Sequence, residues 1–107
     1  MSAAVIREAR PDDLDALVYI EDHSRPGGNW NRRNLECEVL VAGSIVLVAE
    51  KDEKAVGLLV AWRVPPDELH VLELAVLPDY RRQGLAQQLM RQAIVLDRQG
   101  VWLGACM

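Results

Sequence analysis

The segment from Arg81 to Ala86 has the residue types of an anion-binding loop. It follows an apolar stretch, and the amphipathic spacing typical of a helix begins at about Gly84. The first backbone N–H groups of a helix have no partner within the helix, and they attract anions. Gly84 and Ala86 leave room for a phosphate to approach the backbone, while Arg81 and Arg82 add positive charge. The segment therefore predicts a pyrophosphate site.

A plain turn with two solvated arginines is the alternative interpretation of this segment. A glycine at the start of a helix does not decide between the two. The preceding residues do, because an apolar strand at 69–76 leads through the connection at 77–80, which contains Pro78, Asp79 and Tyr80, into the loop. A strand, a short connection and a small-residue helix start together favour the binding loop.

Hydrophobic spacing and turn residues predict the elements that position this loop. The expected strands cover residues 5–9, 44–50, 56–64, 69–76 and 101–106, and the expected helices cover residues 11–23, 31–40 and 84–98. The strand at 69–76 is apolar on both faces and is expected to be central in the sheet. The order β-α-α-β-β-β-α-β predicts an α+β fold, with one domain over residues 1–107.

Composition restricts the partners of this fold. The formal net charge is −4 and no Lys/Arg-rich block is present, which argues against nucleic acid as the main ligand. No apolar run approaches the roughly 20 residues needed to span a bilayer, and the first residues lack the features of a signal peptide. A cytoplasmic protein without membrane contact is expected. Cys37 and Cys106 lie far apart without metal-ligand spacing, so unpaired thiols and no metal site are expected.

The stretch LELAVLPDYRRQGLA at 72–86 resembles motif A of the GNAT acetyltransferases, whose core is (Q/R)-x-x-G-x-(G/A). Arg81, Gly84 and Ala86 stand at its three defined positions. The resemblance is closest to the ribosomal-protein-alanine N-acetyltransferase branch, and it extends more loosely from Val5 to about Leu103. It implies a GNAT-like, mixed and mostly antiparallel sheet flanked by helices, which lacks the last helix and strands of the family.

The resemblance also implies acetyl-CoA as co-substrate, with no metal. In such proteins the end of the motif A strand pairs with the pantetheine arm, and the loop and helix start hold the pyrophosphate. These roles fall on Leu74, Ala75 and Val76 for the pantetheine, and on Arg81, Arg82, Gln83, Gly84, Leu85, Ala86 and Gln87 for the pyrophosphate. An amine, either a small molecule or a protein N-terminus, would attack the thioester directly.

The residues that would handle protons depart from the pattern of this branch. Gly104 stands where the branch carries its Glu base, and the chain ends at Met107, before the branch's Tyr acid. Glu73 and His70 are the remaining candidate bases, although each is equally well interpreted as a strand side chain with a hydrogen-bonding partner. Two hypotheses therefore stand: an active N-acetyltransferase, and a truncated, catalytically impaired module that binds acyl-CoA.

The strand expected at residues 101–106 would have an edge or a face that no later strand covers. Exposed apolar strand edges pair readily with other chains. The sequence therefore also predicts a homodimer that covers this surface.

Overall fold

The computed structural model describes residues 4–24, 30–40, 44–64 and 68–99. Its elements are, in chain order, β1 (Val5–Glu8), the 3₁₀ turn η1 (Pro11–Asp13), α1 (Leu14–Ser24), α2 (Arg32–Leu40), β2 (Ser44–Lys51), β3 (Lys54–Val64), β4 (Glu68–Val76), the 3₁₀ turn η2 (Pro78–Tyr80) and α3 (Leu85–Gln99). The four strands form one antiparallel sheet in the order β1-β2-β3-β4. The α+β class and the order of its elements up to α3 are thus confirmed.

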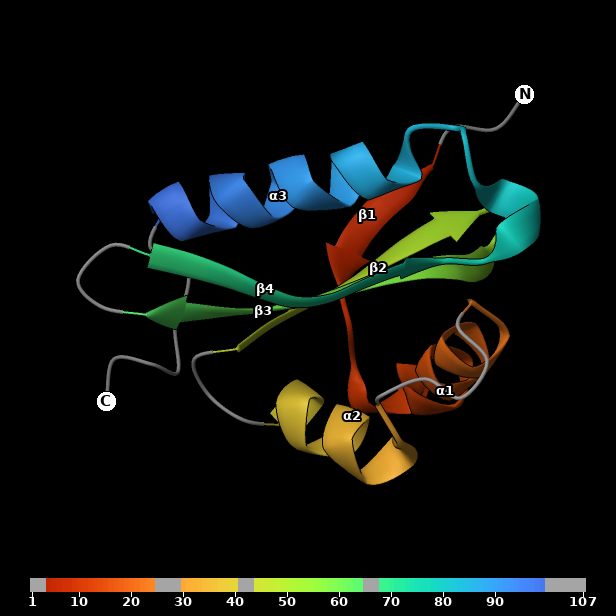
Figure 1. The fold of residues 1–107 in the computed structure, drawn as a ribbon, viewed down its shortest axis with the longest axis horizontal. Coiled ribbons are helices and arrows are strands. Elements are labelled where there is room, and N and C mark those ends of the chain that lie inside the picture. The colour runs from red at the N-terminus through yellow and green to blue at the C-terminus, as the bar shows by residue number, and fades with distance from the viewer. Residues whose placement is uncertain (1–3, 25–29, 41–43, 65–67, 100–107) are drawn as a thin grey trace.

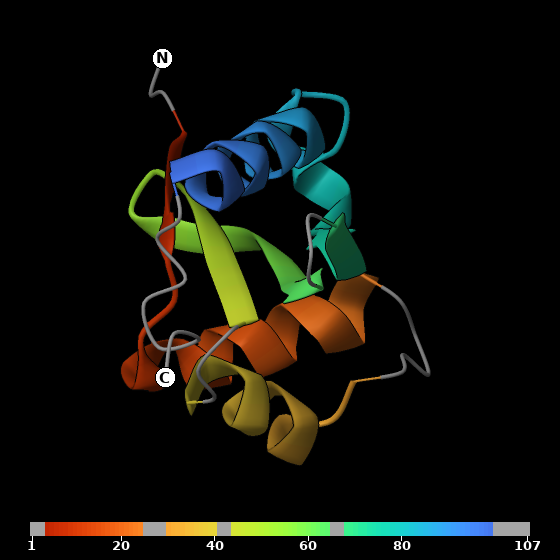
Figure 2. The same ribbon diagram turned by 90° about the vertical axis from the view of Figure 1, so that its left-hand side faces the viewer.

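Two helical layers enclose the sheet, with α3 on one face and the pair α1 and α2 on the other (Figure 1). The view turned by 90° shows the same separation (Figure 2). Leu17 and Ile20 of α1 and Leu35 of α2 belong to the apolar cluster on one side, and Leu89 and Ala93 of α3 belong to the cluster on the other. All five side chains are fully buried, so both faces of the sheet contribute to the core.

Helices cover β4 on both sides, which accounts for the apolar residues on both of its faces. Among the described strands β4 lies at the edge of the sheet. Its central position stays a prediction, because the strand expected at 101–106 is not among them. Leu72 and Ala75 pack in the α1 and α2 layer, whereas Val71 and Leu74 pack in the α3 layer. The strand expected at 101–106, and with it the edge on which the homodimer prediction depends, lies outside the described residues.

A β-bulge in β4 shifts its register against β3. Val60 pairs with Glu73 and Ala61 pairs with Val71, so that Leu72 is an extra residue on β4. Such a bulge bends the strand and changes which side chains face each layer. The bend lies before the end of β4 and therefore affects the direction in which the chain enters the following loop.

A partly buried ion-pair network joins the N-terminal strand to the turn before α1. The Arg7 guanidinium donates hydrogen bonds to both carboxylate oxygens of Asp13 at 2.8 Å, and to Glu50 Oε2 at 3.0 Å. Asp13 also accepts a hydrogen bond from the backbone N–H of Arg10 at 2.7 Å. The hydrogen bonds from Arg7 hold the pKa of the Asp13 carboxyl below its ordinary value of 3.8. The charged form of Asp13 therefore links η1 to β1, and the separate contact between Arg7 and Glu50 links β1 to β2.

Within the described ranges, none of the helices is both long and apolar enough to cross a membrane.

Candidate functional site

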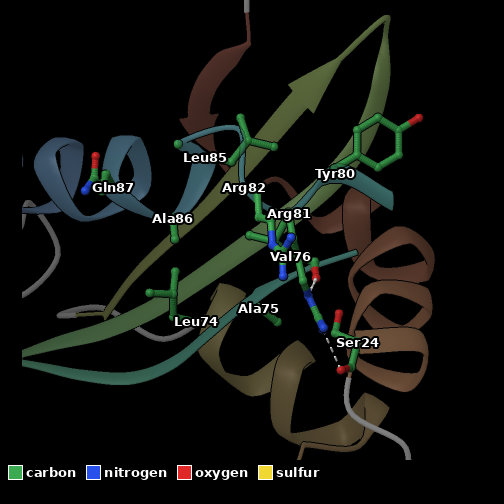
Figure 3. Close-up of a pocket in the computed structure, with 11 residues that line it drawn as sticks. Ser24, Leu74, Ala75, Val76, Tyr80, Arg81, Arg82, Leu85, Ala86 and Gln87 are labelled. Carbon is green, nitrogen blue, oxygen red and sulfur yellow. Dashed lines mark hydrogen bonds between the residues drawn. The ribbon is translucent and has the colours of Figure 1, made fainter. Parts of the chain in front are cut away.

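A cavity of about 510 Å³ opens where the end of β4, the loop before α3 and the end of α1 meet (Figure 3). This volume lies within the usual range for small-molecule sites. The cavity is lined by Ser24, Leu74, Ala75, Val76, Tyr80, Arg81, Arg82, Gly84, Leu85, Ala86 and Gln87. The strand end and the loop that the sequence singled out thus share one hollow.

One of the predicted cofactor-binding residues, Gln83, does not line this cavity. Its side-chain carbonyl instead accepts a hydrogen bond from the Lys51 ammonium at the end of β2. Two lining residues, Ser24 and Tyr80, were not among the predicted ones. Tyr80 lies inside the motif stretch and could have been included. Ser24 comes from α1, far away in sequence, and no local pattern could have identified it.

The start of α3 has the backbone geometry of an anion site. The N–H of Gln88 donates to the carbonyl oxygen of Gly84 at 3.0 Å, so the helix begins directly after Gly84. The N–H groups of Leu85, Ala86 and Gln87 therefore lie in the first turn, where the helix itself provides no acceptor. All three residues line the cavity, at the positive end of the helix dipole.

Gly84 is required by its backbone conformation. Its φ is +80°, in the left-handed region that costs other residues about 1 kcal/mol or more. A Cβ atom built on Gly84 would meet no heavy atom within 4 Å. The loop is therefore open above Gly84, and the constraint on this position is the dihedral angle and not crowding by the protein.

Arg81 makes hydrogen bonds to two elements on the edge of the cavity. Its Nε donates to the carbonyl oxygen of Val76 at 3.0 Å, and its terminal nitrogen donates to the carbonyl oxygen of Ser24 at 2.8 Å. Figure 3 shows this side chain running from the loop toward the last turn of α1. The guanidinium thus joins the end of β4 to the end of α1, and its charge compensates the negative end of the α1 dipole.

Arg82 differs from its neighbour. It also lines the cavity, but within the described ranges it has no hydrogen-bond or ion-pair partner. Its φ of +64° is uncommon for a residue with a side chain. Strain of this kind persists where the surrounding structure or a function requires it. Arg82 therefore presents an uncommitted positive charge beside the first turn of α3.

Neither candidate base lines the cavity. Glu73 is buried in β4, and its Oε1 accepts a hydrogen bond from the N–H of Leu74 at 3.0 Å. His70 is exposed, with its Nε2 at 2.9 Å from Glu68 Oε1. The catalytic roles predicted for both residues stay predictions. No cluster of three or more His, Cys, Asp or Glu side chains suited to a metal occurs in the described part of the chain.

Comparisons with known proteins agree with this geometry. A family model described as an acetyltransferase (GNAT) domain matches residues 42–106. A curated protein of Bacillus subtilis, which has the provisional name ribosomal-protein-bS18-alanine N-acetyltransferase, is 31% identical over 97 residues. That alignment covers 90% of this chain and 63% of the relative, so the chain spans less than two thirds of its length.

Two solved structures share the fold at lower sequence identity. The ribosomal-protein-S18-alanine N-acetyltransferase of Escherichia coli superposes with a TM-score of 0.80 at 23% identity, over 91% of this chain and 61% of the other. The PaiA N-acetyltransferase of Thermoplasma acidophilum, solved in complex with coenzyme A, gives a TM-score of 0.79 at 16% identity, over 92% and 74% of the two chains. At these identities the likeness shows the fold alone.

Proposed function

The chain belongs to the GNAT acetyltransferase family, and from this membership and the cavity we propose that it binds acetyl-CoA and transfers the acetyl group to an amine. One observation carries the proposal. The first turn of α3, the left-handed Gly84 and the uncommitted charge of Arg82 meet the end of β4 in a single cavity. This arrangement suits a ligand with a pyrophosphate at one end and an amide-containing arm at the other.

Two parts of coenzyme A, the pyrophosphate and the pantetheine arm, have counterparts in this arrangement. The pyrophosphate would accept hydrogen bonds from the N–H groups of Leu85, Ala86 and Gln87, next to the Arg82 guanidinium. The pantetheine arm would lie along β4, which is the edge strand among the described ones. An edge strand offers backbone donors and acceptors to an extended ligand. Leu74, Ala75 and Val76, which line the cavity, would make these contacts.

The chemistry needs few protein groups. The amine nitrogen forms a bond to the thioester carbonyl carbon, the C–S bond breaks, and the departing thiolate takes up the proton that the nitrogen loses. The acceptor ammonium must lose a proton before its attack. Glu73 and His70 remain our proposed proton acceptors, and Glu73 is the nearer in sequence to the residues of β4 that line the cavity. The acceptor is proposed to be a small amine or a protein N-terminus, since two relatives are named for alanine N-acetylation of a ribosomal protein.

A second candidate function is binding of acyl-CoA without turnover. The hydrogen bond between the Leu74 N–H and the Glu73 carboxylate favours it, because that N–H then cannot polarise a thioester carbonyl. Gly104 also favours it, because the ribosomal-protein-alanine N-acetyltransferase branch, which the sequence resembles, has its Glu base at that position.

Two measurements on the same protein test the proposal. Isothermal titration calorimetry with coenzyme A measures binding, and thiol release from acetyl-CoA in the presence of an alanine-initiated peptide measures transfer. Binding together with thiol release supports the transferase. Binding without release selects the second candidate. If no heat of binding is detected, both candidates are wrong.

The location and the assembly of the protein belong to the same proposal. We place the chain in the cytoplasm, where its donor acetyl-CoA is formed and used. The homodimer predicted for residues 101–106 stays a prediction. Light scattering at micromolar concentration tests it, and the mass of a single chain would contradict it.

A further inference from the structure

A second hollow, of about 340 Å³, lies between α2 and the C-terminal half of β3. It is lined by Trp30, Asn34, Cys37, Glu38 and Trp62. None of these residues lines the cavity assigned to the cofactor. The hollow therefore needs an explanation of its own.

The indole of Trp62 is held in place although it is 44% exposed. Its Nε1 donates a hydrogen bond to Glu38 Oε1 at 2.6 Å. The Ser44 hydroxyl donates to the same carboxylate oxygen, also at 2.6 Å. A large aromatic ring that is both exposed and anchored at its edge is preorganised for a ligand, because little freedom remains to be lost on binding.

We propose that this hollow binds an organic cation, either an alkylammonium or an alkylguanidinium group. Indole rings attract cations at their faces, and tryptophan does so most strongly. The Glu38 carboxylate adds a full negative charge at the same place. Among the described residues, no lysine or arginine lines the hollow. An anion would meet Glu38 unfavourably, and a neutral ligand would leave its charge uncompensated.

The strand pairing shows how far the hollow lies from the cofactor cavity, where the amine would react. Trp62 pairs with His70, and Leu74 of the cofactor cavity lies four residues further along β4. Because Leu72 is an extra residue opposite β3, this span matches the three residues from Trp62 to Leu59. At roughly 3.3 Å per residue the separation is about 10 Å, too far for one nitrogen to occupy both places. On the proposed acetyl transfer, the cation is thus a second, non-reacting group of the acceptor. About three extended residues of a peptide span the same distance.

Nuclear magnetic resonance of the intact chain tests the site without any cofactor. The indole N–H signal of Trp62 is followed while n-butylammonium or n-butylguanidinium is added, with neutral n-butanol as the control at constant ionic strength. Both cations are expected to shift the signal with a saturable dependence, and n-butanol is not. Equal responses to the cations and to n-butanol, or no response at all, would overturn the proposal.

Two substitutions on α2 show whether the carboxylate is responsible. Glu38→Gln keeps an acceptor for Trp62 and Ser44 but removes the charge, and it should raise the Kd for the cations about fivefold or more. Glu36→Gln makes the same change of charge on the same helix, outside the hollow, and should leave the Kd unchanged. Equal effects of the two variants would mean nonspecific attraction and would refute the site.

The link to the acceptor has its own test. An alanine-initiated tetrapeptide with lysine at its fourth position should shift the Trp62 indole signal at lower concentration than the same peptide with norleucine. Equal affinities of the two peptides would refute the acceptor role. Because neither titration requires coenzyme A, a failure of the proposed acetyl transfer would leave the butylammonium result standing, and the two failures remain distinguishable.

Discussion

Substitution of the two neighbouring arginines of the loop should have different effects: loss of Arg81 should lower Tm, and loss of Arg82 should weaken coenzyme A binding. Arg81 donates hydrogen bonds to the carbonyl oxygens of Val76 and Ser24, whereas Arg82 lines the cavity and has no such bond among the described residues. We therefore compare Arg81→Gln with Arg82→Gln. The two variants lose the same charge from adjacent positions, so each serves as the control for the other.

The contacts set the expected sizes of the effects. Arg81→Gln loses two charge-assisted hydrogen bonds, and partial exposure reduces each to about 1 kcal/mol, or roughly 1–2 kcal/mol in total. For a domain of this size such a loss lowers Tm by about 5–10 °C. Arg82→Gln breaks no bond within the described structure and should change Tm by less than about 2 °C. It removes a charge beside the proposed pyrophosphate position, which should raise the Kd for coenzyme A about tenfold.

Differential scanning calorimetry and titration calorimetry with coenzyme A measure both quantities on the same samples. The Kd of Arg82→Gln should approach that of the unmodified chain as salt is increased, because screening weakens an exposed charge. The Tm difference of Arg81→Gln should depend less on salt. The reasoning is refuted if Arg81→Gln keeps its Tm while losing coenzyme A, or if Arg82→Gln melts early and binds normally.

Three further predictions follow from contacts described above. Gly84→Ala should lower the unfolding free energy by about 1 kcal/mol, measured by urea denaturation, because φ is +80° although the space is open; an unchanged midpoint would contradict the left-handed geometry. Asp13, whose pKa is lowered by Arg7, contributes stability that is complete above its ordinary value of 3.8 and is lost as pH falls through the lower folded pKa. In the Asp13→Asn variant the unfolding free energy should therefore fall less steeply as pH is lowered into the acid range. The Asp12→Asn variant should show no such change, because the Asp12 side chain is 83% exposed. Gly57→Leu should cost about 1–3 kcal/mol in thermal unfolding, because a Cβ there already lies 3.3 Å from Ala75 O and 3.4 Å from Leu89 Cδ1; a stable variant would show that α3 can move away.

Local patterns were sufficient to predict most elements of the fold. The apolar spacing of residues 85–96 and the β-branched strand at 44–50 are strong signals, and both elements appear where they were expected. The order of the strands was a weaker inference. An apolar residue such as Leu74 indicates that its side chain is covered, but its type does not show which element covers it. The composition of β4 therefore does not identify its neighbours in the sheet.

The loop shows the same limit on a smaller scale. The sequence identified its small and basic residues and the anion site they suggest. It could not distinguish Arg81 from Arg82, because their division of labour depends on the carbonyl group of Ser24, a residue 57 positions away in sequence. Likewise, Gln83 lies inside the motif, yet its side chain accepts a hydrogen bond from Lys51 at the end of β2. Contacts between distant segments decide such roles, and a local motif contains no information about them.

The extra residue in β4 has a consequence for how this strand can change in evolution. Leu69 and Val71 face the α3 layer, and the next residue to do so is Leu74, three positions later instead of two. Deleting Leu72 would restore regular alternation and leave Leu74 on the α3 face and Glu73 opposite Val60. The strand would lose only the bend that the bulge introduces, and the direction in which its end meets the following loop would change. We therefore expect homologous chains to vary in residue type along this strand while preserving the number of its residues.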